Sequence, residues 1–370
     1  MKIVVAPDKF KGSLTATAVA GAIMRGLRAS REHLDIVCVP VADGGDGTVD
    51  AAVAAGFDRH LITVAGPTGE QVECGIALRQ GTAVVELASV CGIELLPHRI
   101  LRPLVASSFG LGQALSAALD AGATSIVLGL GGSASTDGGA GMLQALGGRL
   151  LDRAGQPVGR GGRVLADIAE VDLSPVSARF AGIRVVLASD VDNPLLGPSG
   201  SAAVYGPQKG ATADDVAALD RGLAHWAHLV SAATGTHAAG LPGAGAAGGV
   251  GFAAQAVLNA TTRPGIEVVL ELAGFRAALA GADLVVTGEG HLDAQTLRGK
   301  AVAGVARLAV RANVPVVAIA GAVTVTPEQL HELGVAAAYS LGTLEPDQHR
   351  RMTDAADLTE QLAAQILSRH

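Results

Sequence analysis

The stretch LVVTGEGHLDAQTLRGKAVAGVARLAV, residues 284–310, carries the pattern that decides the fold of this 370-residue chain. A short apolar run, Leu284–Val286, is followed by a polar, glycine-containing loop and then by an Ala-rich amphipathic stretch, Ala301–Val310. Apolar runs of this kind are typical of strands buried on both faces, and their alternation with helices predicts a parallel sheet and an α/β fold. The same order recurs at Ile3–Ala6 with Thr15–Arg28, Ile36–Val41 with Thr48–Ala55, Ser125–Leu128 with Gly139–Leu146, and Val316–Ile319 with Pro327–Leu333.

Two segments depart from this alternation. Residues 74–88, CGIALRQGTAVVELA, predict two strands joined by a turn at Gln80-Gly81, so that at least one sheet is mixed. Residues 238–251 are almost pure Gly, Ala and Pro, which predicts either a linker or a glycine loop near a ligand. The length of the chain predicts two or three domains at ~100–200 residues each.

Composition excludes several classes of function. The net charge is −7 without a large basic block, and aromatic residues make up only 2%, so binding of nucleic acid is disfavoured. The three cysteines form no CxxC motif, which suits a reducing compartment, and each is expected to be a buried thiol. The apolar stretch Val314–Val323 is well below the ~18 residues of a membrane span. We therefore expect a cytoplasmic protein.

Carboxylates are concentrated in the loops that follow the apolar runs. Because ligands bind outside the carboxyl ends of strands in open α/β sheets, these loops are the expected site. Any one of the acidic residues is equally well explained by a helix cap or an Asx turn. Carboxylates crowded around one cleft repel each other unless a cation lies among them, and such oxygen ligands suit Mg²⁺. The residues concerned are Asp8, Asp43, Asp46, Asp137, Asp190, Asp192, Glu289 and Asp293.

Glycines and lysines accompany these carboxylates. The run Gly131, Gly132, Ser133 and the pair Gly138-Gly139 would let backbone N–H groups approach phosphate oxygens. Each of three glycine-containing motifs also contributes a candidate lysine, which is either a phosphate ligand or an ordinary surface residue. These lysines are Lys11, Lys209 and Lys300.

General nucleotide-binding and hydrolase motifs do not explain this pattern. The P-loop pattern GxxxxGK[ST] is absent, because Gly299-Lys300 is followed by Ala301. The literal GxGxxG match that begins at Gly243 follows no predicted strand, so it is weak. Asp190-Val-Asp192 resembles the DxD nucleophile motif of haloacid-dehalogenase-like phosphohydrolases, but Pro194 stands where that motif needs Thr or Val.

Several longer segments of the chain together form a recognisable pattern. They are APDKFKGSLTA at 6–16, PVADGGDGT at 40–48, GLGGSASTDGGAGMLQALG at 129–147, SDVDNPLLG at 189–197, YGPQKGA at 205–211, PGAGAAGG at 242–249 and TGEGHLDAQTLRGK at 287–300. In this order they resemble the bacterial glycerate kinases of the type found in the glucarate and tartronate-semialdehyde pathways. The resemblance runs from end to end of the chain, and it departs from the family pattern at Lys9, where Ser is usual, and at His291, where Arg or Ser is usual.

The resemblance implies a kinase that uses ATP and Mg²⁺ to phosphorylate D-glycerate at the 2-hydroxyl, with a 3-kinase as the alternative. It implies two α/β domains with the active site in the cleft between them, one with a Rossmann-like parallel sheet and one with a mixed sheet. The first would comprise residues 1–62 plus 281–370, and the second would be the insertion at 63–280. We expect small-molecule substrates, no nucleic acid or membrane partner, and a monomer or homodimer.

Roles follow for the individual residues. Asp190 is predicted to be the general base, because DVDN places two carboxylates and an amide after one strand, and Lys11, Lys209 and Lys300 would neutralise phosphate or carboxylate charge. For the function of the chain as a whole, a phosphohydrolase and a nucleotide-binding regulator remain as alternatives to the kinase. Asp46, Asp192 and Asp293 are the predicted metal ligands. The predicted substrate- and ATP-binding residues are Asp8, Ser13, Asp43, Gly131, Gly132, Ser133, Asp137, Asn193 and Glu289.

Overall fold

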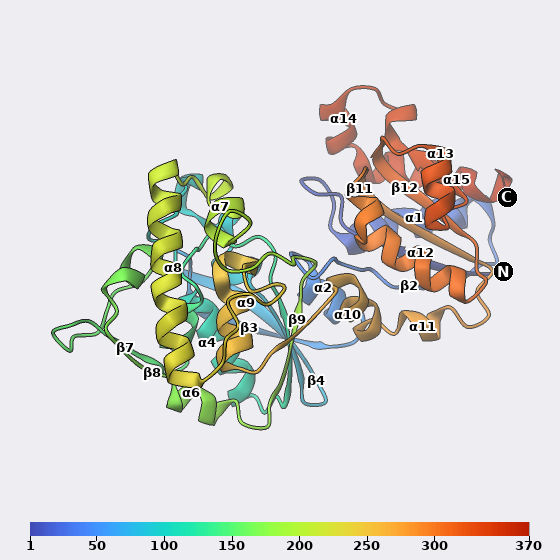
Figure 1. The fold of residues 1–370 in the computed structure, drawn as a ribbon. Helices are drawn as coiled ribbons and strands as arrows, with labels where there is room; N and C mark the ends of the chain where they lie inside the picture. Colours follow the sequence, from blue (N-terminus) through green and yellow to red (C-terminus); the bar gives the residue numbers. More distant parts are fainter. Residues whose placement is uncertain (370) are drawn as a thin grey trace. The chain divides into compact units, whose positions relative to one another are not determined.

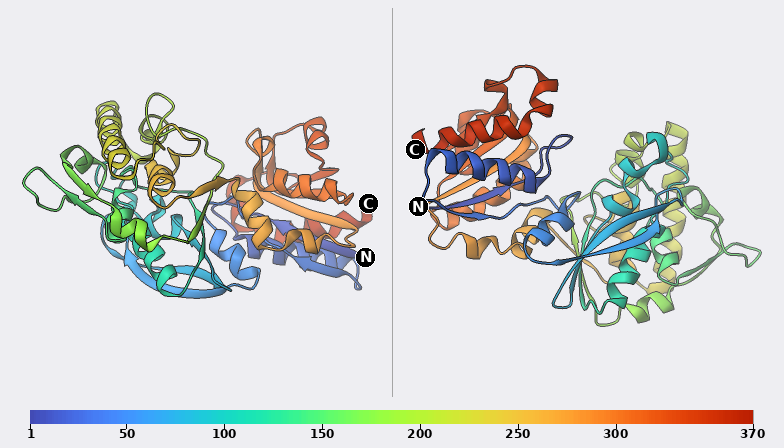
Figure 2. Two further views of the ribbon diagram at one scale, coloured as in Figure 1. Left: turned by 60° about the horizontal axis from the view of Figure 1, so that its bottom comes forward. Right: turned by 180° about the vertical axis from the view of Figure 1, so that it is seen from behind.

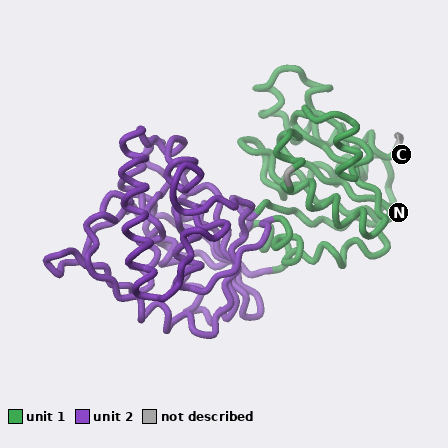
Figure 3. Tube along the Cα trace, viewed as in Figure 1, with its two compact units in different colours: residues 1–43, 50–56, 266–370 green, residues 44–49, 57–265 purple. Residues whose placement is uncertain are grey.

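A computed structural model of the chain describes residues 1–369 and divides into two compact units (Figures 1 and 3). Unit 1 comprises residues 1–43, 50–56 and the chain from residue 266 onward, and unit 2 comprises residues 44–49 and 57–265. The predicted boundaries at 62/63 and 280/281 lie further along the chain. They differ because strand β3 belongs to the sheet of unit 2, while Ile266 and Phe275 belong to the core of unit 1.

The sheet of unit 1 has five strands in the order β13-β12-β11-β1-β2, and all of its pairings are parallel. Both chain ends contribute to it, because β1 lies between β2 and β11. This unit has the predicted parallel sheet. Its strands are β1 (Lys2–Pro7), β2 (Asp35–Cys38), β11 (Leu284–Leu292), β12 (Val316–Val323) and β13 (Ala337–Ser340).

Helices cover both faces of this sheet, and strand β1 shows how the faces are separated. Ile3 and Val5 pack into a core with α1 and α15, whereas Val4 and Ala6 pack into a second core with α10 and α12. Side chains alternate between the two faces of a strand, so an all-apolar strand serves both cores. Figure 2 shows α1 and α15 together on one side of the sheet. The helices of unit 1 are α1 (Ala16–Ser30), α2 (Thr48–Ala54), α10 (Gly265–Leu272), α11 (Phe275–Ala278), α12 (Ala301–Arg311), α13 (Pro327–Leu333), α14 (Gln348–Thr353) and α15 (Ala355–Arg369), with 3₁₀ turns η5 (Thr296–Arg298) and η6 (Leu341–Thr343).

The sheet of unit 2 has six strands in the order β10-β9-β6-β5-β4-β3 and is mixed. β3, β4 and β5 pair antiparallel, and the remaining pairings are parallel. The predicted hairpin is confirmed, because Arg79 pairs with Thr82 across the turn at Gln80 and Gly81. The strands are β3 (Asp58–Ala65), β4 (Gln71–Arg79), β5 (Thr82–Glu86), β6 (Ser125–Gly129), β9 (Arg184–Ala188) and β10 (Thr261–Arg263), with a separate pair β7 (Arg149–Leu151) and β8 (Glu170–Asp172).

One large core joins this sheet to its helices, and its centre includes the single tryptophan, Trp226. The long helix α8 carries Trp226, whose indole N–H donates to the Gly138 carbonyl at 3.0 Å. The helices of unit 2 are α3 (Ala88–Cys91), α4 (Phe109–Asp120), α5 (Ala140–Ala145), α6 (Ser174–Arg179), α7 (Ser201–Tyr205), α8 (Ala213–Thr234) and α9 (Ala246–Val257), with 3₁₀ turns η1 (Ile93–Leu95), η2 (Pro97–Arg99), η3 (Gly162–Asp167) and η4 (Pro207–Lys209).

The glycine-rich segment at residues 238–251 is not a linker. It enters α9 through a left-handed turn at Ala247, Gly248 and Gly249, which packs against the loop that follows β6. A Cβ at Gly248 would lie 2.0 Å from the carbonyl oxygen of Ser135, so only glycine fits there. The low side-chain volume of this segment therefore serves close packing of two backbone loops.

Two further expectations can be compared with the structure. Among residues 1–369, no helix is both long enough and apolar enough to cross a membrane. Cys74 and Cys91 are buried thiols as predicted, but Cys38 is exposed, because it ends the edge strand β2.

Candidate active site

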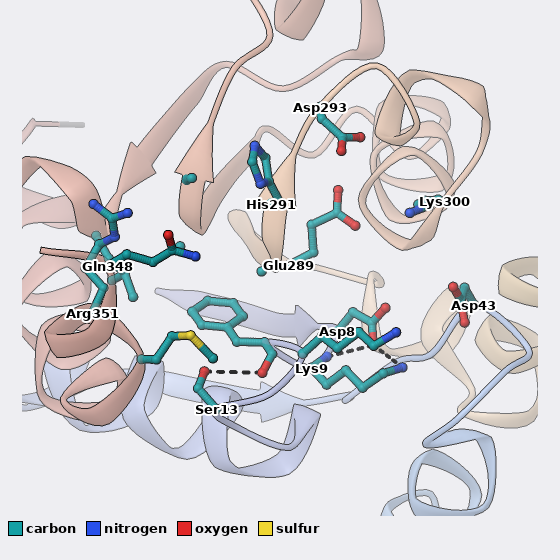
Figure 4. Close-up of a pocket in the computed structure, with 17 residues that line it drawn as sticks. Asp8, Lys9, Ser13, Asp43, Glu289, His291, Asp293, Lys300, Gln348 and Arg351 are labelled. Atoms are coloured by element: carbon teal, nitrogen blue, oxygen red, sulfur yellow. Dashed lines mark hydrogen bonds and ion pairs between the residues drawn. The ribbon is translucent and has the colours of Figure 1, made fainter. Parts of the chain in front are cut away.

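A pocket of about 380 Å³ opens in unit 1 where β1, β11 and β12 end (Figure 4). The parallel sheet places the carboxyl ends of these strands at one edge, so residues that are far apart in the sequence become neighbours. Seven of the predicted site residues line this pocket, together with Lys9 and His291. These seven are Asp8, Lys11, Ser13, Asp43, Glu289, Asp293 and Lys300.

Glu289, on β11, is a carboxylate of the pocket whose pKa is shifted. Its side chain is buried, and the hydroxyl of Thr296 donates a hydrogen bond to its Oε1. Burial raises the pKa of Glu289 to about 7; the Thr296 hydrogen bond and the charge of Lys300 oppose this increase, and the charges of Asp8 and Asp293 add to it. Glu289 can therefore take up or release a proton near neutral pH.

The turn between β11 and α12 fixes the positions of Asp293 and Lys300. Asp293 accepts the backbone N–H of Gln295 at 2.8 Å through Oδ1, while its own N–H donates to the Thr296 hydroxyl. Lys300 stands at the N-cap position of α12, directly after Gly299, whose φ of 110° favours glycine. The motif thus places one carboxylate and one cation at the pocket from a single turn.

The loop after β1 supplies the other side of the pocket. Asp8 is buried and its Oδ1 accepts the backbone N–H of Lys9 at 2.6 Å, while the Lys9 ammonium lies 3.8 Å from the same oxygen. Ser13 donates to the carbonyl of Phe10 at 3.2 Å. Lys11 is exposed, in the same loop. The Lys9 departure from the family pattern therefore introduces a cation beside a pocket carboxylate.

Sequence reasoning missed one wall of this pocket. Leu341, Gln348, Arg351 and Met352 line it, from η6 and α14. The sequence did contain a signal for this wall. These residues follow the apolar run that forms β13, and ligands bind outside the carboxyl ends of the strands in such sheets.

In unit 2, Asp137 lies in the loop after β6 and is fully buried. Its Oδ2 accepts the backbone N–H and the hydroxyl of Ser108 at 2.7 and 2.9 Å, the hydroxyl of Ser107 at 3.2 Å and the backbone N–H of Gly141 at 3.3 Å. Its Oδ1 accepts the Gly139 backbone N–H. A carboxylate with these partners organises the loop, while the expected direct contact with substrate stays a prediction.

The glycines of this loop also serve packing. A Cβ at Gly131 would lie 2.5 Å from the Cα of Gly45, so the loop after β6 touches the DGGDGT loop through backbone alone. Gly132 has a φ of 71°. Ser133 is buried and donates to the carbonyl of Ser135 at 3.2 Å. The two glycine loops of unit 2 thus hold each other in place, and Asp46 in the first of them is exposed.

Lys209 is buried beneath the same loop and donates to the Ser135 carbonyl. Burial lowers the pKa of Lys209 to about 8, and the negative charge of Asp137 partly opposes this decrease. Lys209 thus supports the loop from inside unit 2.

The DVDN motif follows β9. Asp190 is exposed and its Oδ1 accepts the backbone N–H of Gly265 at 3.0 Å, and Asp192 is exposed as well. Asn193 accepts the hydroxyl of Tyr205 at 2.6 Å and donates to the Ser199 carbonyl at 2.8 Å. The predicted binding residue Asn193 thus ties the loop together, while the two carboxylates face solvent.

Within the part of the chain that the structure describes, no three His, Cys, Asp or Glu side chains gather into a metal-binding cluster. The predicted ligands Asp46 and Asp192 belong to unit 2, and Asp293 belongs to unit 1. Mg²⁺ commonly uses only one or two protein carboxylates and takes its other ligands from water and substrate phosphates. The oxygen-rich lining of the unit 1 pocket fits this mode of binding.

Comparison with known proteins places this site in a family. Residues 3–370 match the glycerate kinase family. A glycerate kinase of Halalkalibacterium halodurans is 44% identical over 98% of this chain and 97% of its own length. The glycerate 2-kinase of Escherichia coli is 43% identical over 93% of this chain and 92% of its own length. A crystal structure of a Salmonella typhimurium LT2 protein assigned as glycerate kinase 2 covers 100% of this chain and 98% of its own, with 41% identity and a TM-score of 0.87.

These matches span both units. They contradict the phosphohydrolase alternative, which rested on the short DVDN segment. The chain belongs to the glycerate kinase family.

Proposed function

We propose that this protein transfers the γ-phosphoryl group of ATP to the 2-hydroxyl of D-glycerate, with Mg²⁺ as cofactor. The observation that carries the proposal is the near-full-length similarity to proteins named glycerate kinase, which include the glycerate 2-kinase of Escherichia coli. The pocket of unit 1 supports it, because a polyhydroxy acid needs hydrogen-bond acceptors for its hydroxyls and cations for its carboxylate.

The chain's own residues supply the positioning and the charge that phosphoryl transfer requires. Lys11 and Lys300 line the pocket of unit 1 and neutralise anionic oxygens of the substrates. Asp8, Asp43 and Glu289 accept hydrogen bonds from hydroxyl groups. In unit 2, the buried set around Asp137 and Lys209 keeps the glycine loop rigid, which presents its backbone N–H groups in a fixed arrangement.

Asp293 is the residue of the unit 1 pocket that would hold Mg²⁺. Its recorded hydrogen bonds to backbone N–H groups use only Oδ1, so within the described residues Oδ2 is available as a ligand. A Mg²⁺ ion held there would supply positive charge beside the phosphoryl group that is transferred.

Two carboxylates are candidates for the general base that accepts the proton of the attacking hydroxyl. Asp190 was predicted from sequence and lies exposed at the end of β9. Glu289 is favoured by its place in the pocket and by a pKa of about 7, since a base is most effective near the working pH.

The position of phosphorylation is tested by an assay with D-glycerate and MgATP in which enolase is the only coupling enzyme. Enolase acts directly on 2-phosphoglycerate, so we expect product formation without added phosphoglycerate mutase. A signal that appears only after mutase is added would establish the 3-kinase instead. Consumption of ATP that does not depend on D-glycerate would reject the proposed function.

Glu289→Gln and Asp190→Asn separate the two candidate bases. With Glu289 as the base, kcat/KM of the wild type rises as pH increases through about 7, because the glutamate must be ionised to accept the proton. We expect Glu289→Gln to lower kcat by about 100-fold and to flatten this rise, and Asp190→Asn to retain it. The opposite result would assign the base to Asp190. Circular dichroism of both variants checks that they are folded.

A further inference from the structure

Arg351 lines the pocket of unit 1 and is held there by backbone groups. Its Nη1 donates to the carbonyls of Glu345 at 3.2 Å and Pro346 at 2.9 Å. These two bonds occupy both hydrogens of Nη1. Within the described residues, the Nε–H and the two Nη2 hydrogens have no recorded partner, and they form the side-on edge that binds a carboxylate through two parallel hydrogen bonds.

The surroundings of Arg351 restrict the motion of this guanidinium. A Cβ at Gly342 would lie 3.3 Å from its Nη1, so η6 packs directly against the guanidinium. Helix α14 continues into Met352, whose terminal methyl lies 3.1 Å from where a Cβ of Gly12 would stand. The helix therefore rests on the loop after β1, and Arg351 is positioned before any ligand arrives.

The charges of the pocket are unevenly distributed. Asp8 and Glu289 are buried carboxylates near its centre, whereas Arg351 and Gln348 occupy the side away from Lys300 and Asp43 (Figure 4). A hydroxy acid has the matching polarity, because its hydroxyls donate to carboxylates and its own carboxylate accepts from a guanidinium.

We propose that Arg351, supported by Gln348, binds the carboxylate of the hydroxy-acid substrate and so selects acids over uncharged polyols. This inference rests on the proposed function and names the residue that recognises the acid group. The same edge of the guanidinium would also suit a phosphate oxygen of the nucleotide. We favour the carboxylate, because acceptors for substrate hydroxyls lie in the same pocket, whereas the glycine loops suited to phosphate belong to unit 2.

The experiment compares Arg351→Met with Arg350→Met. Arg350 is the preceding residue of α14, is exposed and does not line the pocket, so its replacement is a matched control. We expect Arg351→Met to raise the KM for D-glycerate by about 10–100-fold, the effect of losing a charged hydrogen-bond pair, with little change in the KM for ATP. Arg351→Lys keeps the charge without the planar edge and should restore only part of the affinity.

A second readout uses glycerol, which has hydroxyls like those of glycerate but no carboxylate. The ratio of kcat/KM for D-glycerate to that for glycerol should fall by a similar factor in Arg351→Met and stay unchanged in Arg350→Met. Calorimetric titration of D-glycerate into each folded variant measures the same affinity without relying on turnover.

The outcomes distinguish this inference from the proposed function. An active Arg351→Met variant with an unchanged KM for D-glycerate would overturn the inference alone. A raised KM for ATP with an unchanged KM for D-glycerate would also overturn it and would assign Arg351 to a phosphate group. If the wild type bound D-glycerate without phosphorylating it, the proposed function would fall, while the calorimetric affinity of Arg351→Met would still decide the inference.

Discussion

Asp137 and Glu289 occupy similar positions in the sequence, each after an apolar run, but tertiary contacts give their carboxylates different environments. Both follow apolar runs and both were predicted to bind substrate. Asp137 is fully buried inside unit 2 and is enclosed by hydroxyl and backbone donors. Glu289 accepts from the Thr296 hydroxyl and has two other carboxylates as neighbours, so burial dominates and its pKa rises. One residue is held by donors within its own loop, and the other lines the pocket with a pKa of about 7.

The structural role of Asp137 predicts a large effect on stability. Asp137→Asn turns one acceptor of this cluster into an NH₂ group that faces donors. We expect a loss of about 3 kcal/mol in the free energy of unfolding, because several buried donors lose a charged acceptor. Urea denaturation measures this loss.

The control for this prediction is Asp214→Asn, at an exposed position in the first turn of α8. It should change the free energy of unfolding by less than about 0.5 kcal/mol. Equal stabilities of the two variants would show that the cluster around Asp137 contributes nothing beyond an ordinary surface carboxylate.

At the scale of elements, the packing of α1 against α15 in unit 1 depends on one glycine. A Cβ at Gly26 would lie 2.1 Å from the Glu360 carbonyl oxygen and 2.8 Å from the Cβ of Ala363. Gly21 lies in the same helix, and the nearest atom to its Cβ would be the flexible end of Arg25 at 3.6 Å. The close packing of α15 therefore requires glycine at position 26, whereas no neighbouring backbone requires it at position 21.

Alanine at these two positions should act in opposite directions. Gly26→Ala forces the two helices apart, and we expect a loss of about 2 kcal/mol or more. Gly21→Ala raises helix propensity at a half-buried position and should stabilise the protein by about 0.5–1 kcal/mol. Thermal or urea unfolding of both variants tests this, and a stabilising Gly26→Ala would contradict the packing described here.

The hairpin of unit 2 is an element that local sequence decides almost alone. Gln80 and Gly81 have φ values of 48° and 75°, as a two-residue hairpin turn requires, and short apolar runs flank them. The start of α9 is the opposite case. Its glycines indicated a flexible or ligand-binding segment, but their left-handed turn is imposed by the loop at Ser135 against which they pack.

On the scale of the whole molecule, the chain ends meet in one unit and the middle of the chain forms the other. Strand β1 pairs with β11, so the loop after residue 7 and the end of β11 with the turn that follows it border the same pocket. This arrangement explains why the motifs of one site stand at the two extremes of the sequence. The boundaries of the two units lie nearer the N-terminus than the boundaries expected from the family resemblance.

The sequence by itself determined the α/β class, the mixed sheet, the hairpin and seven residues of the unit 1 pocket, because these depend on local hydrophobic patterns and on the rule that parallel strands end at one edge. Only the tertiary structure decided which acidic residues line the pocket and which are enclosed by hydrogen-bond donors, as the contrast between Asp137 and Glu289 shows. It also added Arg351 and Gln348 to the pocket, from a helix that follows the last strand. The physical reason is that burial and hydrogen-bond partners arise from residues distant in the chain, and they set the charge state and the orientation of each side chain.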